Sequence, residues 1–244
     1  MTAIDILRAA LVIVAAIAQA VMGSWPQWRR WEHSVPERSA RLHLPIVPWP
    51  PFFAIWGVIF LASFGFAIWH ALPANLDDPL LRMLGWFAVA AWTLNTAWEC
   101  HVPRRDIDWT SLVLIAAALA VLLAAMATIG RAPSERGLSF WLGIAPIQLL
   151  AGWISAAVWV NLGSTLKWSG VPVRTAWQIV LLLGAGALGS MVAWLSGSPV
   201  YAGAVAWALA GIVVQNIVRD RNLPISLTAA FLAPAAVVAA LISS

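Results

Sequence analysis

The chain has 244 residues, of which 62% are hydrophobic and only 10% are charged, and its mean hydropathy is +0.85. A soluble domain of this length needs a charged surface, so this composition excludes a water-soluble globular protein. Several apolar runs reach the roughly 20 residues that a spanning helix needs, and they lack the alternation typical of a β-barrel strand. We therefore expect an all-α integral membrane protein, a polytopic helical bundle.

The charged residues point to membrane topology rather than to a nucleic-acid partner. The net charge is only +4, and the Lys and Arg residues are spread between the apolar runs instead of forming one basic face. The single cysteine, Cys100, excludes an intrachain disulfide and a cysteine-based metal cluster. We expect no metal site and no nucleic-acid binding.

Eight candidate spans follow one another along the chain. They cover residues 4–23, 51–72, 81–101, 109–130, 138–165, 174–196, 199–218 and 225–243. The first span lacks a strongly basic start and a small-residue cleavage site, so we interpret it as a retained helix rather than a signal peptide. The competing prediction has seven spans, with the last segment, interrupted by Pro234, lying at the interface.

The first connection, residues 24–50, is the longest segment that is not apolar. It mixes Trp25, Trp28 and Trp31 with arginine residues, and it ends in a proline-rich stretch that contains Trp49. Two interpretations stay open: an interfacial segment lying on lipid headgroups, or a lid over a cavity between helices. The loops after spans one, three, five and seven hold most of the basic residues, so we expect the first loop to be cytoplasmic.

Tryptophan is unusually frequent, with 17 residues against a single tyrosine, and two segments place it beside an asparagine. Asn95 and Trp98 share a helix face, with Glu99 close by. Trp153, Ala157 and Asn161 share a face at four-residue steps. If the two faces converge, they form an apolar slot with two amide ends. The alternative is that both amides only bond neighbouring helices.

Three segments together resemble the TspO/MBR family, the tryptophan-rich sensory or translocator proteins. They are "FFAIWGVIFLASFGFAIWHALP" (52–73), "WTLNTAWE" (92–99) and "LLAGWISAAVWVNL" (149–162), preceded by Pro50 and Pro51. The resemblance implies a five-helix unit over residues 1–166, with the first loop closing a ligand cavity. Residues 167–244 are similar to the longer bacterial branch of the family, which adds two or three C-terminal transmembrane helices. A bacterial inner-membrane location would follow.

Known members of that family bind porphyrins, sterols and synthetic aromatic ligands, and many are homodimers. By position, the resemblance implies that Trp98, Trp153, Ala157 and Asn161 line the cavity, with Asn95 nearby. The sequence departs from the family at Leu149 and Leu150, where a Pro-Tyr pair is usual, and in the aromatic motif after the two prolines. Trp56 is the nearest indole to that motif.

We therefore expect a membrane receptor or carrier for a flat hydrophobic ligand such as a tetrapyrrole, a carotenoid or a sterol-like lipid. No cofactor is required, and the expected partners are membrane lipids, that ligand and a second copy of the chain. The alternative is a structural or pigment-holding subunit of a larger membrane complex, in which His70 or His101 ligates a metal-centred macrocycle. We expect no catalytic residues, because the polar cluster after span three lies in a loop and no catalytic motif is present.

Overall fold

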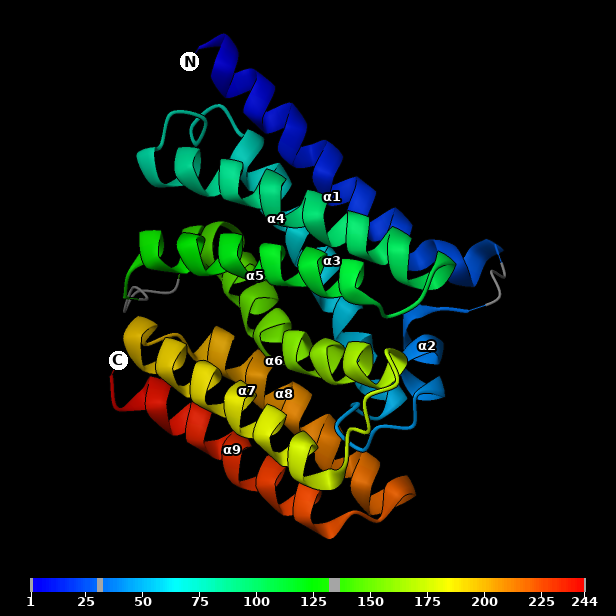
Figure 1. Ribbon diagram of the computed structural model, residues 1–244. Helices are drawn as coiled ribbons and strands as arrows, with labels where there is room; N and C mark the ends of the chain where they lie inside the picture. Colours follow the sequence, from blue (N-terminus) through cyan, green and yellow to red (C-terminus); the bar gives the residue numbers. More distant parts are fainter. Residues whose placement is uncertain (1, 30–32, 132–136, 244) are drawn as a thin grey trace.

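The computed structural model describes residues 2–29, 33–131 and 137–243, and all regular structure in these ranges is helical (Figure 1). The α-helices are α1 (Ala3–Arg29), α2 (Val35–Arg41), α3 (Ile55–Ala71), α4 (Pro79–Arg104), α5 (Trp109–Ile129), α6 (Ala145–Trp168), α7 (Thr175–Ser196), α8 (Pro199–Gln215) and α9 (Leu223–Leu241). A 3-10 segment, η1 (Pro50–Ala54), leads into α3, and two π-helical segments, η2 (Phe140–Ile144) and η3 (Asn216–Asp220), precede α6 and follow α8. The predicted polytopic helical bundle is confirmed.

Within the described residues, seven helices are long and apolar enough to cross a membrane. They are Ala3–Pro26, Pro50–Ala71, Trp109–Ile129, Phe140–Trp168, Thr175–Ser196, Pro199–Asp220 and Leu223–Leu241. Helix α4 has the length, at 26 residues, but it carries Arg82, Asn95 and Glu99, and it packs against α1 and α5. The last segment, α9, is a 19-residue helix that packs on α7 and α8.

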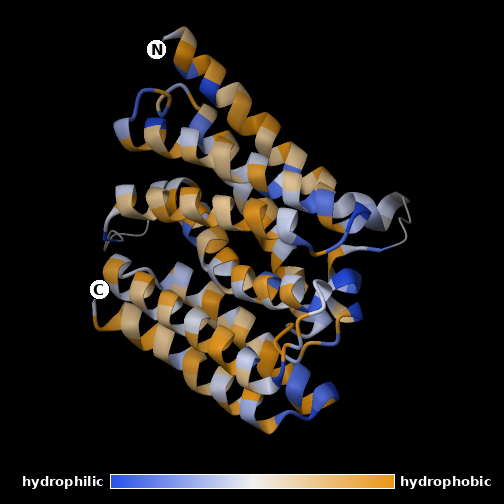
Figure 2. Ribbon diagram, in the orientation of Figure 1, coloured by the Kyte–Doolittle hydropathy of each residue, from blue (hydrophilic) through white to orange (hydrophobic). Residues whose placement is uncertain are grey.

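The connections of the bundle gather at two ends (Figure 1). Helix α2 and the α4–α5, α6–α7 and α8–α9 connections lie at one end, which we call the α2 end, and both termini lie at the other. Polar residues concentrate at the ends, most of all at the α2 end, while the lengths of the helices are largely apolar (Figure 2). This pattern is the one expected of a bundle whose middle faces lipid.

Several helices begin with the same local arrangement, a side-chain cap followed by proline. Asp78, Ser198 and Asn222 each accept a hydrogen bond from the backbone N–H three residues later. Each is followed by a proline in the first turn, where the missing N–H has no intrahelical partner to lose. These short signals fix the start of α4, α8 and α9.

The first connection is shorter than the sequence suggests. Helix α1 continues through Pro26 to Arg29, so Trp25 and Trp28 lie on α1 and not in a loop as predicted. Trp31 lies outside the described residues. Helix α2 then begins at a capping box, in which Ser34 and Glu37 bond each other's backbone N–H groups. The Ser-x-x-Glu spacing of "SVPE" is a sequence signal for this helix.

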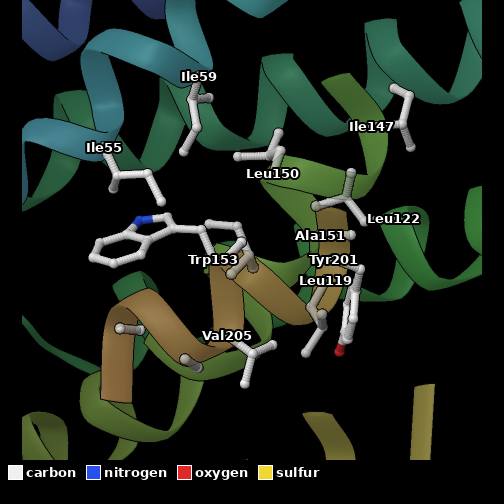
Figure 3. Close-up of a cluster of buried hydrophobic side chains, with 14 of the residues drawn as sticks. Ile55, Ile59, Leu119, Leu122, Ile147, Leu150, Ala151, Trp153, Tyr201 and Val205 are labelled. Carbon is white, nitrogen blue, oxygen red and sulfur yellow. The ribbon is translucent and has the colours of Figure 1, made fainter. Parts of the chain in front are cut away.

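Helix α6 occupies the centre of the bundle and packs against α3, α5, α7 and α8. Its side chains meet those of α3, α5 and α8 in one buried apolar cluster (Figure 3). In that view Trp153 extends from α6 toward Ile55 of α3, with Tyr201 and Val205 of α8 nearby. The buried Tyr201 hydroxyl donates to Ser155 Oγ at 2.8 Å, which joins α8 to α6.

Candidate functional site

A cavity opens between α3, α4, α6 and α8 and is covered by α2, and we call it the first cavity. It encloses about 540 Å³ of space between atoms, part of it open to the surroundings. Its lining is mostly apolar, and comprises Val35, Ser39, Pro48, Phe53, Trp56, Trp98, Ile107, Trp153, Ala156, Ala157, Val160, Asn161, Ser164, Ala208 and Ile212.

Aromatic rings form one wall of the first cavity. The rings of Trp56 and Trp98 are nearly parallel, with centroids 6.5 Å apart and an interplanar angle of 27°. Trp153 meets Trp56 edge-on at 6.1 Å and 82°, and meets Phe53 edge-on at 5.9 Å. Such interlocked rings hold one another in place and present flat apolar surfaces to a ligand.

Four polar groups at the first cavity have no hydrogen-bond partner. They are the indole nitrogens of Trp98 and Trp153, Asn161 Nδ2 and Ser164 Oγ. All four belong to buried residues, and each can donate a hydrogen bond. A buried polar group without a partner is costly, so this set of donors favours a bound molecule with hydrogen-bond acceptors.

The two ends of the Asn161 amide have different surroundings. Its Oδ1 lies 3.2 Å from Ser111 Oγ of α5 and 3.3 Å from Thr165 Oγ1. The same two hydroxyls also lie 2.7 Å and 3.1 Å from the Asp108 carbonyl oxygen. Each hydroxyl has one proton to donate, so the two hydroxyls share their protons between two acceptors, Asn161 Oδ1 and the Asp108 carbonyl oxygen. The carbonyl end thus ties α6 to the start of α5, while the Nδ2 end is unpartnered at the cavity.

The C-terminal helices bond the segment that connects α2, which covers the first cavity, to α3. Trp207 Nε1 of α8 donates to the Phe52 carbonyl at 2.9 Å, and the Trp49 N–H donates to the Gly211 carbonyl at 3.0 Å. Asn216 Nδ2 donates to the Pro45 carbonyl at 2.7 Å. Residues 45–52 are therefore anchored to α8 and η3, and this anchoring fixes how α2 sits over the cavity.

The structure brings together five of the six predicted ligand residues. Trp56, Trp98, Trp153, Ala157 and Asn161 all line the first cavity. Asn95, the sixth, does not line it: its Nδ2 bonds Gln19 Oε1 at 3.3 Å and Glu99 Oε1 at 3.1 Å. The asparagine lies one helical turn before Glu99, on the face of α4 that meets α1.

The predicted interfacial tryptophans lie at different places. Trp28 is 67% exposed and lines a second cavity beside the first one. Trp25 is half-buried on α1, and Trp49 is half-buried with its backbone bonded to α8. Neither Trp25 nor Trp49 lines the first cavity. The residues of the first connection that do cover it are Val35, Ser39 and Pro48.

Sequence reasoning missed the polar Ser164 and the contribution of α8. Ser164 follows Asn161 by three residues and so shares its helix face, a signal that was available in the sequence. Ala208 and Ile212 of α8 close the cavity from the C-terminal part of the chain. Their small and aliphatic side chains carry no local signal of a site.

The histidines considered as macrocycle ligands already have partners at Nε2. His70 Nε2 accepts from Arg8 Nε at 3.1 Å, within a buried cluster in which Asp5 pairs with Arg8 and Arg82 at 3.0 Å each. His101 Nε2 lies 2.8 Å from Asp108 Oδ1. In the described part of the chain, no group of three His, Cys, Asp or Glu residues is arranged to hold a metal ion.

Comparison with known proteins supports the likeness that the motifs suggest. Residues 6–242 match the family described as TSPO-like protein. The matched range covers the C-terminal helices as well as the first five spans. A search of curated proteins and a search of solved structures found no match. Because the family match covers nearly the whole chain, this protein belongs to the TSPO-like family.

Proposed function

We propose that this protein is a membrane receptor or carrier that binds a flat hydrophobic molecule in the first cavity. The observation that carries this proposal is the set of four unpartnered polar groups, on Trp98, Trp153, Asn161 and Ser164, in an otherwise apolar site. The aromatic rings would stack against the faces of the ligand, and the donors would meet its acceptor atoms. A tetrapyrrole, a carotenoid with oxygen substituents or a sterol-like lipid has this chemistry.

The proposal extends to topology. At the termini end of the bundle, the buried Asp5 pairs with both Arg8 and Arg82 and so offsets one of their two positive charges. At the α2 end, Arg38 pairs with Asp106, while Arg41, Arg105, Lys167, Arg174, Arg219 and Arg221 are exposed or half-buried. By the excess of positive charge on cytoplasmic loops, the α2 end would face the cytoplasm of a bacterial inner membrane. The first cavity would then lie toward the cytoplasmic side.

Binding of protoporphyrin IX, an oxygenated carotenoid and cholesterol to the protein in nanodiscs tests the proposal. We expect one of these ligands to quench tryptophan fluorescence in a saturable manner with one site per chain. Asn161→Leu replaces the whole amide, including the unpartnered Nδ2, with an apolar side chain, and Trp153→Phe removes the indole N–H while keeping an aromatic ring. Each variant should weaken binding by on the order of tenfold, which is about 1.4 kcal/mol.

Trp159→Phe is the matched control. Its indole nitrogen is also buried and unpartnered, and it lies on the same helix, but it does not line the first cavity. This variant should bind like the original chain. Equal affinity in all three folded variants, or no saturable binding of any of the three ligands, would contradict the proposal.

For the alternative of a pigment-holding subunit, Nε2 of both candidate histidines already has a polar partner in the described part of the chain. Ligation through Nε2 of His70 or His101 would have to displace Arg8 or Asp108. Homodimer formation stays a prediction from the family resemblance.

A further inference from the structure

A second cavity lies next to the first, between α1, α2, α3 and α4. It encloses about 920 Å³ of space between atoms, part of it open to the surroundings. It shares Val35, Phe53, Trp56 and Trp98 with the first cavity, so these residues form a wall between the two. Its other lining residues are Gly23, Ser24, Trp28, Pro36, Gly57, Phe60 and Glu99.

The lining of the second cavity differs from that of the first in its charge. Glu99 is the one ionisable residue among its described lining residues, and it is only 2% exposed. Its Oε1 accepts from Asn95 Nδ2 at 3.1 Å, whereas its Oε2 has no hydrogen-bond partner. Among the described residues, no basic side chain forms an ion pair with it. An ionised carboxylate that is buried without a cation, or without a donor at one oxygen, destabilises a protein, so such a residue within a membrane bundle is a candidate for a binding role.

The position of Glu99 is built into the packing of α1 on α4. A Cβ atom at Gly23 of α1 would lie 2.8 Å from Glu99 Oε1 and 2.5 Å from the ring of Phe60. Glycine at this position is what leaves room for the carboxyl group between the two helices. The glutamate is held on its other side by the chain of bonds from Asn95 to Gln19 and Ser63.

Aromatic rings surround the rest of the second cavity. Trp56 stacks on Phe60 at 5.7 Å with an interplanar angle of 27°, and its ring centroid lies 6.5 Å from that of Trp98. Phe53 and the largely exposed Trp28 complete the aromatic lining. Faces of indole and phenyl rings attract cations, and aromatic cages are a recurring way to bind organic ammonium groups.

From these observations we propose that the second cavity binds a lipophilic ammonium ion. Its N–H group would donate to Glu99 Oε2, and its apolar part would lie against Trp28, Trp56 and Phe60. The ammonium group can belong to a free amphiphilic amine or to the headgroup of phosphatidylethanolamine, since the cavity is next to α2 at the polar end of the bundle (Figure 2). The two proposed sites share Trp98 and the other residues that line both cavities, but Trp153, Asn161 and Ser164 line only the first cavity.

The test compares 4-phenylbutylamine with 4-phenylbutan-1-ol, a pair that differs only in the charged head. Both are titrated against the full chain in phosphatidylglycerol nanodiscs, with tryptophan fluorescence and thermal shift as readouts. We expect the amine to bind at least tenfold more tightly than the alcohol. Glu99→Gln should abolish this preference, because the neutral amide lacks the charge that selects the ammonium group. Equal binding of amine and alcohol would overturn the proposal, and so would a preference that survives Glu99→Gln.

Two further variants separate this site from the first one and from effects on folding. Trp28→Ala changes an exposed ring that lines only the second cavity, so it should weaken amine binding even if Glu99→Gln folds poorly. Asn161→Leu should leave amine binding unchanged. Loss of amine binding in Asn161→Leu but not in Trp28→Ala would place the amine in the first cavity and overturn the proposal.

Mass spectrometry of lipids that copurify with the protein distinguishes the two sources of the ammonium group. Enrichment of phosphatidylethanolamine over phosphatidylglycerol, lost in Glu99→Gln, would assign the site to a lipid headgroup. Amine binding without such enrichment would assign it to a free amine.

Discussion

At the scale of single residues, the two buried asparagines, Asn95 and Asn161, differ in the groups that their amides contact. Asn95 uses its Nδ2 to join α4 to α1 and to hold Glu99, so this end of its amide serves the bundle, while its Oδ1 has no hydrogen-bond partner. Asn161 serves both purposes, since its carbonyl oxygen contacts hydroxyls of α5 and α6 while its Nδ2 is left at the first cavity. The same residue type on two helices thus acquires two roles from its neighbours.

Asp108 supports the Asn161 end of the cavity, and its ionisation should show in the stability of the protein. Burial raises the pKa of this carboxyl, but hydrogen bonds from the Ser111 N–H and from His101 outweigh burial and hold the pKa below its ordinary value. The ionised carboxyl therefore stabilises the fold at every pH above its unfolded-state pKa of about 3.9. This contribution is lost as the pH falls through the lower folded-state pKa.

We expect Asp108→Asn to keep the N-cap of α5 and to remove this acid sensitivity. Between pH 6 and pH 3, the variant should lose less thermal stability than the original chain. Asp77→Asn, at an exposed position at the other end of the bundle, is the control for the change in net charge. Parallel stability curves for the original chain and Asp108→Asn would show that the carboxyl does not contribute in this way.

At the scale of elements, glycines decide how closely the helices approach. In "GAGALGS", a Cβ at Gly184, Gly186 or Gly189 would lie within 3 Å of Trp159 of α6, Leu232 of α9 or Val205 of α8, respectively. One segment of α7 therefore meets three different helices of the same chain. Gly152 of α6 allows the closest approach, since its Cβ would lie 2.3 Å from the Tyr201 carbonyl oxygen of α8.

Gly152→Ala should force α6 and α8 apart, because the clash is with backbone and no side chain can rotate away. We expect a destabilisation of about 1–3 kcal/mol, seen as a lower Tm in detergent. Gly203→Ala is the matched control on α8, because a Cβ there meets no atom within 4 Å. The control should keep or slightly raise the Tm, since alanine favours helix more than glycine. A Tm for Gly152→Ala equal to that of the control would contradict the packing argument.

At the scale of the whole molecule, the C-terminal helices are part of the site. The sequence suggested a five-helix unit over residues 1–166 and a C-terminal transmembrane extension over residues 167–244. In the structure, α8 supplies Ala208 and Ile212 to the first cavity and anchors residues 45–52 through Trp207 and Asn216. The buried Tyr201–Ser155 bond and the Gly152 contact join the two parts further.

A chain that ends at residue 168 should therefore not retain the ligand site, even if its first five spans insert into a membrane. We expect it to lose saturable binding of the ligand identified for the full chain and to be digested by protease within the first connection. Coexpression of residues 169–244 as a separate chain should restore both properties in part. Full binding by the truncated chain alone would show that the extension is dispensable.

Much of this protein was determined by sequence alone. Apolar runs of spanning length define the helical membrane class, because backbone groups in lipid must bond within a helix. Proline and capping residues mark the helix starts, and four-residue steps place Trp153, Ala157 and Asn161 on one face. These properties depend only on neighbours along the chain.

Only the tertiary structure decided which faces meet. The placement of Asn95 against α1, the closing of the cavity by α8, and the burial of Glu99 between α1 and α4 each depend on contacts between residues far apart in the chain. Even the end of α1 was misplaced, because the segment after residue 23 is not apolar and suggested a loop, whereas the helix continues through Pro26 to Arg29. The periodicity of one helix shows which residues share its face, but which helix packs on that face is set by shape and by small residues such as Gly23 and Gly152.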